Sequence, residues 1–122
     1  MDTVTTIQGE LAAPDDPAID LVHLSRMTLG DRALEREVLH MFLRQAAMLL
    51  AGMEVRADEA APLAHRLKGA ARGVGAWRVA AAAEAVEQAV RSSPESLPAA
   101  RAALADRIAD AQAMIEDLLR AE

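Results

Sequence analysis

The chain has 122 residues, a formal net charge of -6 and no cysteine. A length in this range fits one domain with a single core, and the lack of cysteine excludes a disulfide scaffold, a thiolate metal site and a thiol nucleophile. Only 2% of the residues are aromatic, so aliphatic side chains and Met must build the core, which favours closely packed helices over strands. The acidic balance and the lack of a Lys/Arg run argue against nucleic acid as the main partner.

The N-terminal sequence does not predict membrane insertion. Residues 1–6 lack a basic region followed by an apolar run, and no later stretch approaches the about 18 uninterrupted apolar residues that a span needs. We therefore expect a cytoplasmic protein with no membrane partner. Residues 1–15 collect Thr, Gln, Gly, Pro and Asp without any period, which predicts a flexible N-terminal lead before a helical domain at residues 16–122.

Two helices are expected at the start of this domain. The first is short and runs from Ala18 to Leu29, with Pro17 accepted in its first turn and Gly30 ending it. Its apolar positions are Ile19, Val22, Leu24 and Met27. Asp31 is placed to cap a long second helix that runs to about Arg56. Its apolar stripe predicts a central position and contains Leu34, Val38, Phe42, Ala46, Leu49 and Met53, widened by Leu39, Leu43 and Leu50.

The next two helices are expected to form a hairpin. The third begins between Asp58 and Pro62, because proline deeper in the helix would remove a backbone hydrogen bond. Gly73 and Gly75 favour its end. The connection to a partner helix at Trp77 to Ser92 is so short that the two helices must be antiparallel neighbours. The inward positions of the partner helix are Val79, Ala83, Val86 and Val90.

A last helix follows the break at Ser92-Ser93-Pro94. It has Pro98 near its start, and its apolar residues lie mostly three and four apart: Leu97, Leu104, Ile108, Ala111, Ile115 and Leu118. The predicted fold is therefore all-α, an antiparallel up-down-up-down four-helix bundle with a short additional N-terminal helix.

The third helix carries the most informative residues. At roughly 100° per residue, one face holds His65, Lys68, Gly69, Arg72 and, if the helix runs that far, Ala76, while the opposite face holds Leu63, Leu67, Ala70 and Val74. No acidic residue lies between Glu59 and Glu84, whereas four cations fall inside that window: Arg66, Lys68, Arg72 and Arg78. The pattern predicts a solvent-facing imidazole in a cluster of cations.

This face suits phosphoryl transfer. Histidine has an unperturbed pKa of about 6.5, so an exposed imidazole is a good nucleophile at physiological pH without much activation. Lys68 lies one turn from His65 and is within reach of a phosphoryl group there, and Arg72 lies a further turn away. Glycine inside a helix costs roughly 0.5–1 kcal/mol relative to Ala. Gly69 therefore indicates a need for a flat face that a partner can approach.

The same residues carry a family resemblance. His65, Leu67, Lys68, Gly69, Gly75 and Ala76 reproduce the His-x-Leu-Lys-Gly then Gly-Ala signature of histidine-containing phosphotransfer (HPt) domains, the phosphorelay intermediates of two-component signalling. The chain resembles a free-standing member of that family from about Asp16 to Glu122. Upstream, the resemblance rests on Ile19-Asp20, Gly30-Asp31 and Met41-Phe42-Leu43. Ala70 departs from it, because the family commonly has Ser after the motif glycine.

The resemblance implies a function and its site. His65 would accept a phosphoryl group from a receiver-domain aspartate and pass it to another receiver domain, with Lys68 stabilising the phosphoryl charge. The partner-docking residues would be Gly69, Arg72, Ala76 and Arg66.

The resemblance also implies partners, namely response-regulator receiver domains and a sensor or hybrid histidine kinase. A divalent ion is expected on the receiver, and no cofactor or metal on this chain, which we expect to be a monomer. Autonomous kinase activity is not expected, because the sequence has no Gly-rich phosphate loop.

Two alternatives stay open. One is a helical adaptor that binds receiver or kinase domains through the same face without being phosphorylated. The other is a metal-carboxylate bundle enzyme, which needs a Glu-x-x-His motif from each of two helices, whereas this chain offers only Glu37 to His40. His23 and His40 lack the basic, glycine-lined neighbourhood of His65, and we expect neither to be the acceptor. Trp77 is expected to pack at the end of the hairpin.

Overall fold

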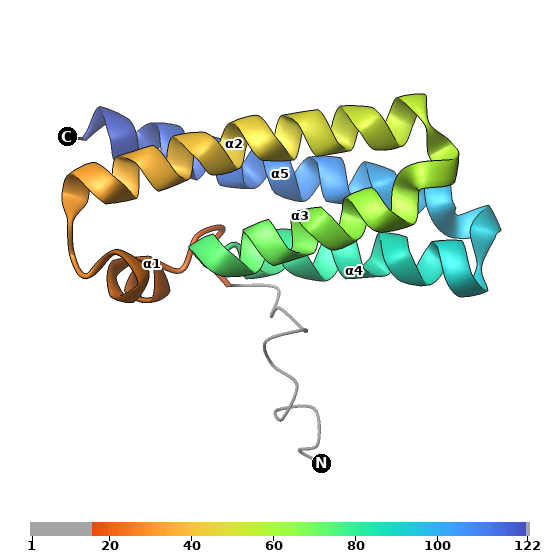
Figure 1. The fold of residues 1–122 in the computed structure, drawn as a ribbon, viewed down its shortest axis with the longest axis horizontal. Coiled ribbons are helices and arrows are strands. Elements are labelled where there is room, and N and C mark those ends of the chain that lie inside the picture. The colour runs from red at the N-terminus through yellow and green to blue at the C-terminus, as the bar shows by residue number, and fades with distance from the viewer. Residues whose placement is uncertain (1–15, 122) are drawn as a thin grey trace, which may run out of the picture.

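The computed structural model describes residues 16–121, which form an antiparallel bundle of four long helices with a short helix across one end (Figure 1). The α-helices are α1 (Leu21–Thr28), α2 (Arg32–Val55), α3 (Ala60–Val74), α4 (Trp77–Ser92) and α5 (Leu97–Arg120), and short 3₁₀ turns at Ala57–Glu59 and Pro94–Ser96 precede α3 and α5. The predicted fold class is confirmed. The predicted flexible lead at residues 1–15 lies outside the described residues.

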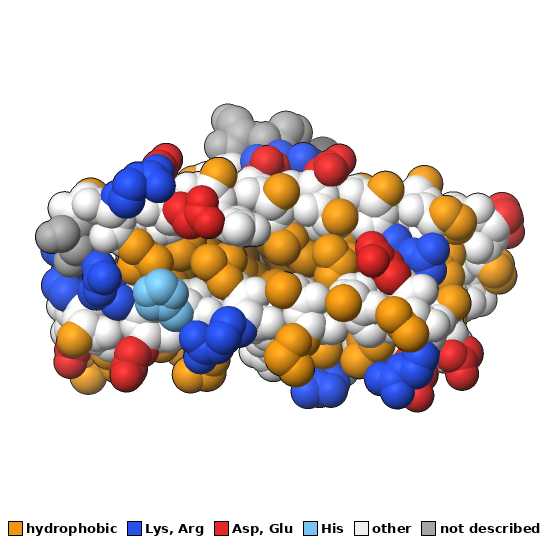
Figure 2. All heavy atoms as spheres, turned by 90° about the horizontal axis from the view of Figure 1, so that it is seen from above, with side chains coloured by type: hydrophobic (Ala, Val, Ile, Leu, Met, Phe, Trp, Pro, Cys, Tyr) orange, Lys and Arg blue, Asp and Glu red, His pale blue; other side chains and the backbone are white. Residues whose placement is uncertain are grey.

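The core lies between the four long helices. α3 packs against α2 on one side and α4 on the other, and α4 also packs against α5. Apolar side chains gather along the boundary between α2 and α5, the first and last of the four long helices (Figure 2). The buried apolar residues of α2 to α5 include Leu39, Phe42, Ala46, Leu49, Met53, Leu63, Leu67, Ala71, Val74, Val79, Ala83, Val86, Leu104, Ile108, Ala111 and Ile115.

Four apolar positions of the predicted helices lie outside the core. Val22 and Met27 are 62% and 58% exposed, because the eight-residue α1 packs against the bundle through Leu24 and Thr28 and leaves its other faces in solvent. Leu34 is also exposed, at the start of α2. Val90, predicted to face inward on α4, is also exposed, at 36%.

Side-chain caps set the beginnings of α1 and α2. The Oδ1 atom of Asp20 accepts a hydrogen bond from the His23 amide at 3.1 Å, so α1 begins at Leu21 and Pro17 lies before it, which corrects the predicted start at Ala18. Asp31 caps α2 as predicted, because its side chain accepts from the Leu34 amide at 3.0 Å. The predicted start of α3 and both ends of α4 are confirmed.

α1 is tied to the turn between α3 and α4. The Asp20 amide donates to the Gly75 carbonyl at 2.9 Å, and the Trp77 indole nitrogen donates to Asp20 Oδ2 at 2.9 Å. His23 stacks edge-on against Trp77 with 4.9 Å between ring centroids. Gly75 has φ +81°, and a Cβ on it would lie 3.0 Å from the Asp20 carbonyl oxygen. Glycine is therefore required both by the backbone conformation and by this close approach.

By length and composition alone, α2 is apolar enough to cross a membrane. The sequence prediction concerned an uninterrupted apolar run, which Arg44 and Gln45 break in this helix. The property is weak evidence for a span, because a core helix passes the same test. α2 packs against α3 and α5 and contributes five buried residues to the core.

Candidate functional site

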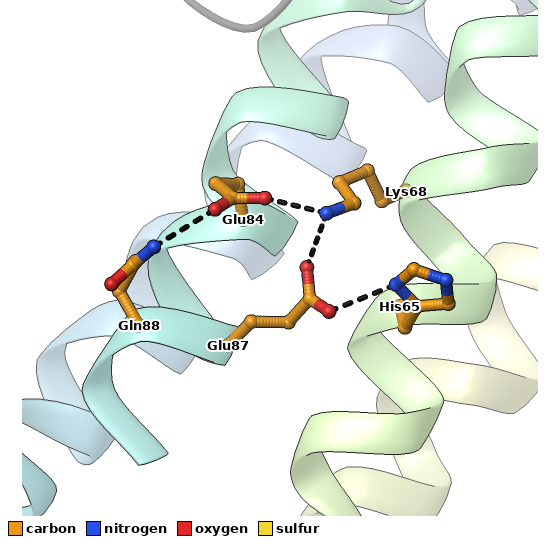
Figure 3. A network of polar contacts seen from close by, with 5 residues as sticks. All are labelled: His65, Lys68, Glu84, Glu87 and Gln88. Atoms are coloured by element: carbon orange, nitrogen blue, oxygen red, sulfur yellow. Dashed lines mark hydrogen bonds and ion pairs between the residues drawn. The ribbon is translucent and has the colours of Figure 1, made fainter. Parts of the chain in front are cut away.

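His65 projects from the middle of α3 with 70% of its side chain exposed. Its Nδ1 atom lies 2.9 Å from Oε2 of Glu87, which α4 brings alongside (Figure 3). A carboxylate can only accept a hydrogen bond, so the geometry places the imidazole proton on Nδ1 and leaves the lone pair on Nε2. The second ring nitrogen of His65 points away from Glu87 in Figure 3. Nε2 therefore carries the free lone pair and points away from Glu87.

Lys68 lies between two carboxylates of α4. Its Nζ atom is 2.5 Å from Oε1 of Glu84 and 2.6 Å from Oε1 of Glu87. Gln88 donates a hydrogen bond to Oε2 of Glu84 at 3.0 Å. The chain of contacts Gln88–Glu84–Lys68–Glu87–His65 is thus continuous (Figure 3). Only 12% of the Lys68 side chain is exposed, which corrects the expectation of a solvent-facing lysine.

These contacts fix the charges of the ion pair. The hydrogen bond from Lys68, followed by the one from Gln88, lowers the pKa of Glu84 to about 2. The pKa of Lys68 is raised from its usual value, first by Glu84 and then by Glu87. Lys68 and Glu84 therefore stay charged across the physiological pH range.

The hairpin explains why Glu84 and Glu87 face α3. His65 and Glu87 lie at nearly equal distances along the chain from the Gly75–Ala76 turn, as do Lys68 and Glu84, and antiparallel helices bring such positions together. The predicted all-cationic neighbourhood of His65 is wrong for this reason. The signal was available in the sequence as two glutamates spaced to meet the histidine and lysine across the turn.

The predicted docking residues divide into two groups. Gly69 and Arg66 are exposed, and a Cβ on Gly69 or on the nearby Gly73 would meet nothing within 4 Å, so this face of α3 is flat and open. Arg72 is partly buried. The assignment of Ala76 to this face is wrong, because Gly75 ends α3 in a left-handed conformation and Ala76 is fully buried in the turn.

α2 carries an exposed apolar stripe that was not predicted from the sequence. Its side chains recur at seven-residue spacing and are more than 40% exposed: Leu34, Met41, Met48 and Val55. Between this stripe and α3 lies a shallow hollow of about 120 Å³, with a lining that includes Met41, Gln45 and Ala70. Ala70 directly follows Gly69 in α3, so the hollow adjoins the flat face. The seven-residue spacing is the sequence signal that could have revealed this stripe, of which only Leu34 was predicted, as part of the core-facing stripe.

The other histidines have different surroundings. His23 is partly buried against Trp77, and His40 is exposed on α2. Within residues 16–121, no group of three or more His, Cys, Asp or Glu side chains is placed to hold a metal ion. The metal-carboxylate enzyme therefore has no supporting geometry in this part of the chain.

A helical bundle with an outward imidazole, oriented by a carboxylate of the adjacent helix, has the features of a histidine phosphotransfer module. The family model described as Hpt domain matches residues 37–121, which include α3 and α4. The chain belongs to the Hpt domain family. Comparison with curated proteins and with solved structures gives no match. Hpt domains serve histidine phosphotransfer in two-component systems, where they interact with receiver domains and histidine kinases.

Proposed function

We propose that this protein is a phosphorelay intermediate that accepts a phosphoryl group on Nε2 of His65 from a receiver-domain aspartate and passes it to another receiver domain. The observation that carries the proposal is the hydrogen bond between His65 Nδ1 and Glu87 Oε2 on a side chain that is 70% exposed. It prepares the tautomer with a free lone pair on Nε2 and leaves that atom accessible to a partner.

The transfer needs no proton to leave the site. The Nε2 lone pair attacks the phosphorus of the aspartyl phosphate, the phosphorus–oxygen bond breaks, and its electron pair returns to the aspartate carboxylate. Nδ1 keeps its proton, so the phosphorylated ring carries a positive charge beside Glu87. In the onward step an acceptor carboxylate attacks phosphorus, and the electron pair of the phosphorus–nitrogen bond returns to Nε2. The divalent ion that assists phosphoryl transfer belongs to the receiver.

The flat face of α3 is the proposed docking surface. Gly69 and Gly73 leave room for a receiver to bring its aspartate within reach of His65. Arg66 and Arg72 supply positive charge that favours approach of an acidic pocket. The apolar stripe of α2 extends this surface, with Met41 as an adaptable contact at the hollow and Met48 as a second one further along the helix.

Lys68 is proposed to stabilise the phosphoryl charge, although its ammonium now lies between Glu84 and Glu87. It is one helical turn from His65 and reaches the phosphoryl oxygens once its side chain turns away from α4. Lys68 therefore exchanges one set of anionic partners for another during the reaction.

Incubation with a receiver domain carrying a labelled aspartyl phosphate tests the proposal. Label should move to the protein in an acid-labile, alkali-stable form, as a phosphoramidate requires, and His65→Gln should abolish it. His40→Gln is the matched control, because His40 is also an exposed helical histidine. Binding of the receiver without transfer of label would instead establish the adaptor function, and undiminished label on His65→Gln would place the acceptor elsewhere.

A further inference from the structure

We propose that Glu84 is a positioning residue that holds the Lys68 ammonium away from the phosphoryl position of His65, and thereby limits how strongly His65 retains a phosphoryl group. The inference rests on the proposed function, because it concerns the same histidine. It adds that a side chain of α4 restrains Lys68 and so influences the proposed phosphorylation of His65 on α3.

The geometry separates the lysine from the reacting atom. The Lys68 ammonium lies on the Glu87 side of the imidazole, within 2.6 Å of a Glu87 oxygen, whereas the second ring nitrogen points away from Glu87 (Figure 3). A phosphoryl group on Nε2 would extend into solvent from that far side. Lys68 must therefore loosen its contacts with α4 before it can neutralise the phosphoryl oxygens.

The carboxylates of Glu84 and Glu87 make different contacts. Glu87 also holds Nδ1 of His65, so it serves the imidazole and the lysine together. Glu84 contacts Lys68 at 2.5 Å and accepts a hydrogen bond from Gln88. One ammonium thus faces two carboxylates, and a phosphoryl group on His65 would add further negative charge nearby. Glu84 opposes phosphorylation both by restraining Lys68 and by adding to this negative charge.

Glu84 can be changed without disturbing the core. Its side chain is 28% exposed, and the buried face of α4 is formed by other residues such as Val79, Ala83 and Val86. Glu84→Gln keeps the size of the side chain and removes its charge. Glu54, exposed on α2, provides a control in which Glu54→Gln makes the same change of net charge away from Lys68.

The first measurement needs no partner protein. Phosphoramidate phosphorylates imidazole directly, because Nε2 attacks phosphorus and the phosphorus–nitrogen bond of the donor breaks with release of ammonia. The phosphorylated whole chain is then titrated by ³¹P NMR. In Glu84→Gln the nearer lysine should favour the doubly ionised phosphoryl group and raise its ionisation constant about two- to fivefold. Glu54→Gln should leave that constant unchanged.

Two further variants separate contact from charge. Glu84→Asp keeps the charge but shortens the reach to Lys68, so its ionisation constant should move toward that of Glu84→Gln. In a Lys68→Met background, Glu84→Gln should lose most of its effect. If Glu84→Asp behaves as wild type and Glu84→Gln acts equally without the lysine, Glu84 acts only through its charge and the positioning role is overturned.

The second measurement is phosphoryl exchange with the receiver. At equilibrium Glu84→Gln should shift the distribution toward phosphorylated His65 by about two- to fivefold. If the wild-type chain fails to exchange with any receiver, the proposed function fails, while the NMR titration still decides the position of Lys68. If wild type exchanges normally and Glu84→Gln changes neither measurement, the inference about Glu84 is wrong and the proposed function stands.

Discussion

Oε2 of Glu87 lies 2.9 Å from Nδ1 of His65, so a side chain of α4 orients the proposed nucleophile of α3. The carboxylate is 10% exposed and also pairs with Lys68. An acceptor held this firmly determines which ring nitrogen carries the proton, and the imidazole needs no rearrangement before attack.

Glu87→Ala should lower the rate of phosphoryl transfer to His65 by about tenfold, as is common when a group that orients a functional imidazole is removed. The ¹⁵N NMR shifts of the ring should show loss of the preference for the Nδ1–H tautomer. Glu87→Gln retains an acceptor oxygen and should recover most of that preference. A normal tautomer ratio in Glu87→Ala would mean that Glu87 does not orient the ring, and circular dichroism checks that the bundle is intact.

Lys68→Met should destabilise the bundle by about 1–2 kcal/mol at neutral pH, because it leaves two adjoining, largely buried carboxylates without their shared cation. Urea unfolding measures this change. The double variant Lys68→Met with Glu84→Gln removes one of the repelling charges and should recover part of the loss. Equal stability of Lys68→Met and wild type would show that the ion pairs contribute nothing to folding.

The ion pair between Glu84 and Lys68 should make the free energy of unfolding depend on pH. The pKa of Glu84 is lowered from 4.5 to about 2 in the folded protein, so its contribution is present above pH 4.5 and is lost as the pH falls toward 2. Wild type should exceed Glu84→Gln in unfolding free energy by about 2 kcal/mol at pH 6, and the two should converge near pH 2. Urea titrations at several pH values measure this difference in unfolding free energy. A difference that does not change with pH would show that ionisation of Glu84 is not its cause.

Gly69→Gln should separate docking from folding. A Cβ at position 69 meets nothing within 4 Å, and glycine costs a helix roughly 0.5–1 kcal/mol, so the variant should be as stable as wild type or slightly more stable. Labelling by phosphoramidate should be unchanged, while exchange with the receiver should fall because the side chain fills the approach to His65. Undisturbed exchange would place the docking surface on another face.

Gly75→Ala, unlike Gly69→Gln, should destabilise the folded protein. Its φ of +81° and the 3.0 Å approach of a Cβ to the Asp20 carbonyl oxygen predict a loss of about 1–3 kcal/mol in unfolding free energy. Thermal unfolding of the two glycine variants side by side tests the contrast. A neutral Gly75→Ala would show that the turn relaxes at no cost.

Much of the fold was predictable because strong local signals agree with the packing. The ends of α4 follow from Gly75 before it and Pro94 after it, and both were predicted correctly. The beginning of α1 was wrong because Pro17 and Asp20 each offer an acceptable start. Trp77, more than fifty residues away, favours Asp20 by binding its carboxylate.

The candidate site was predictable only in part, for the same reason. The exposure of His65 and Gly69 follows from the period of a single helix. The surroundings of Lys68 depend on contacts between two helices, which a reading of one helix cannot supply. Ala76 was misplaced because the helical period was extended past a glycine that reverses the chain.

The contact between His65 and Glu87 joins residues only 22 positions apart through one tight turn. Contacts of such short sequence separation form early in folding, because little chain entropy is lost in closing the loop. The site should therefore be assembled as soon as the α3–α4 hairpin forms, and transient opening of that hairpin alone would part the carboxylate from the imidazole. Hydrogen exchange at the amides of α3 and α4 should therefore report how often the hairpin opens and His65, the proposed nucleophile, loses its contact with Glu87.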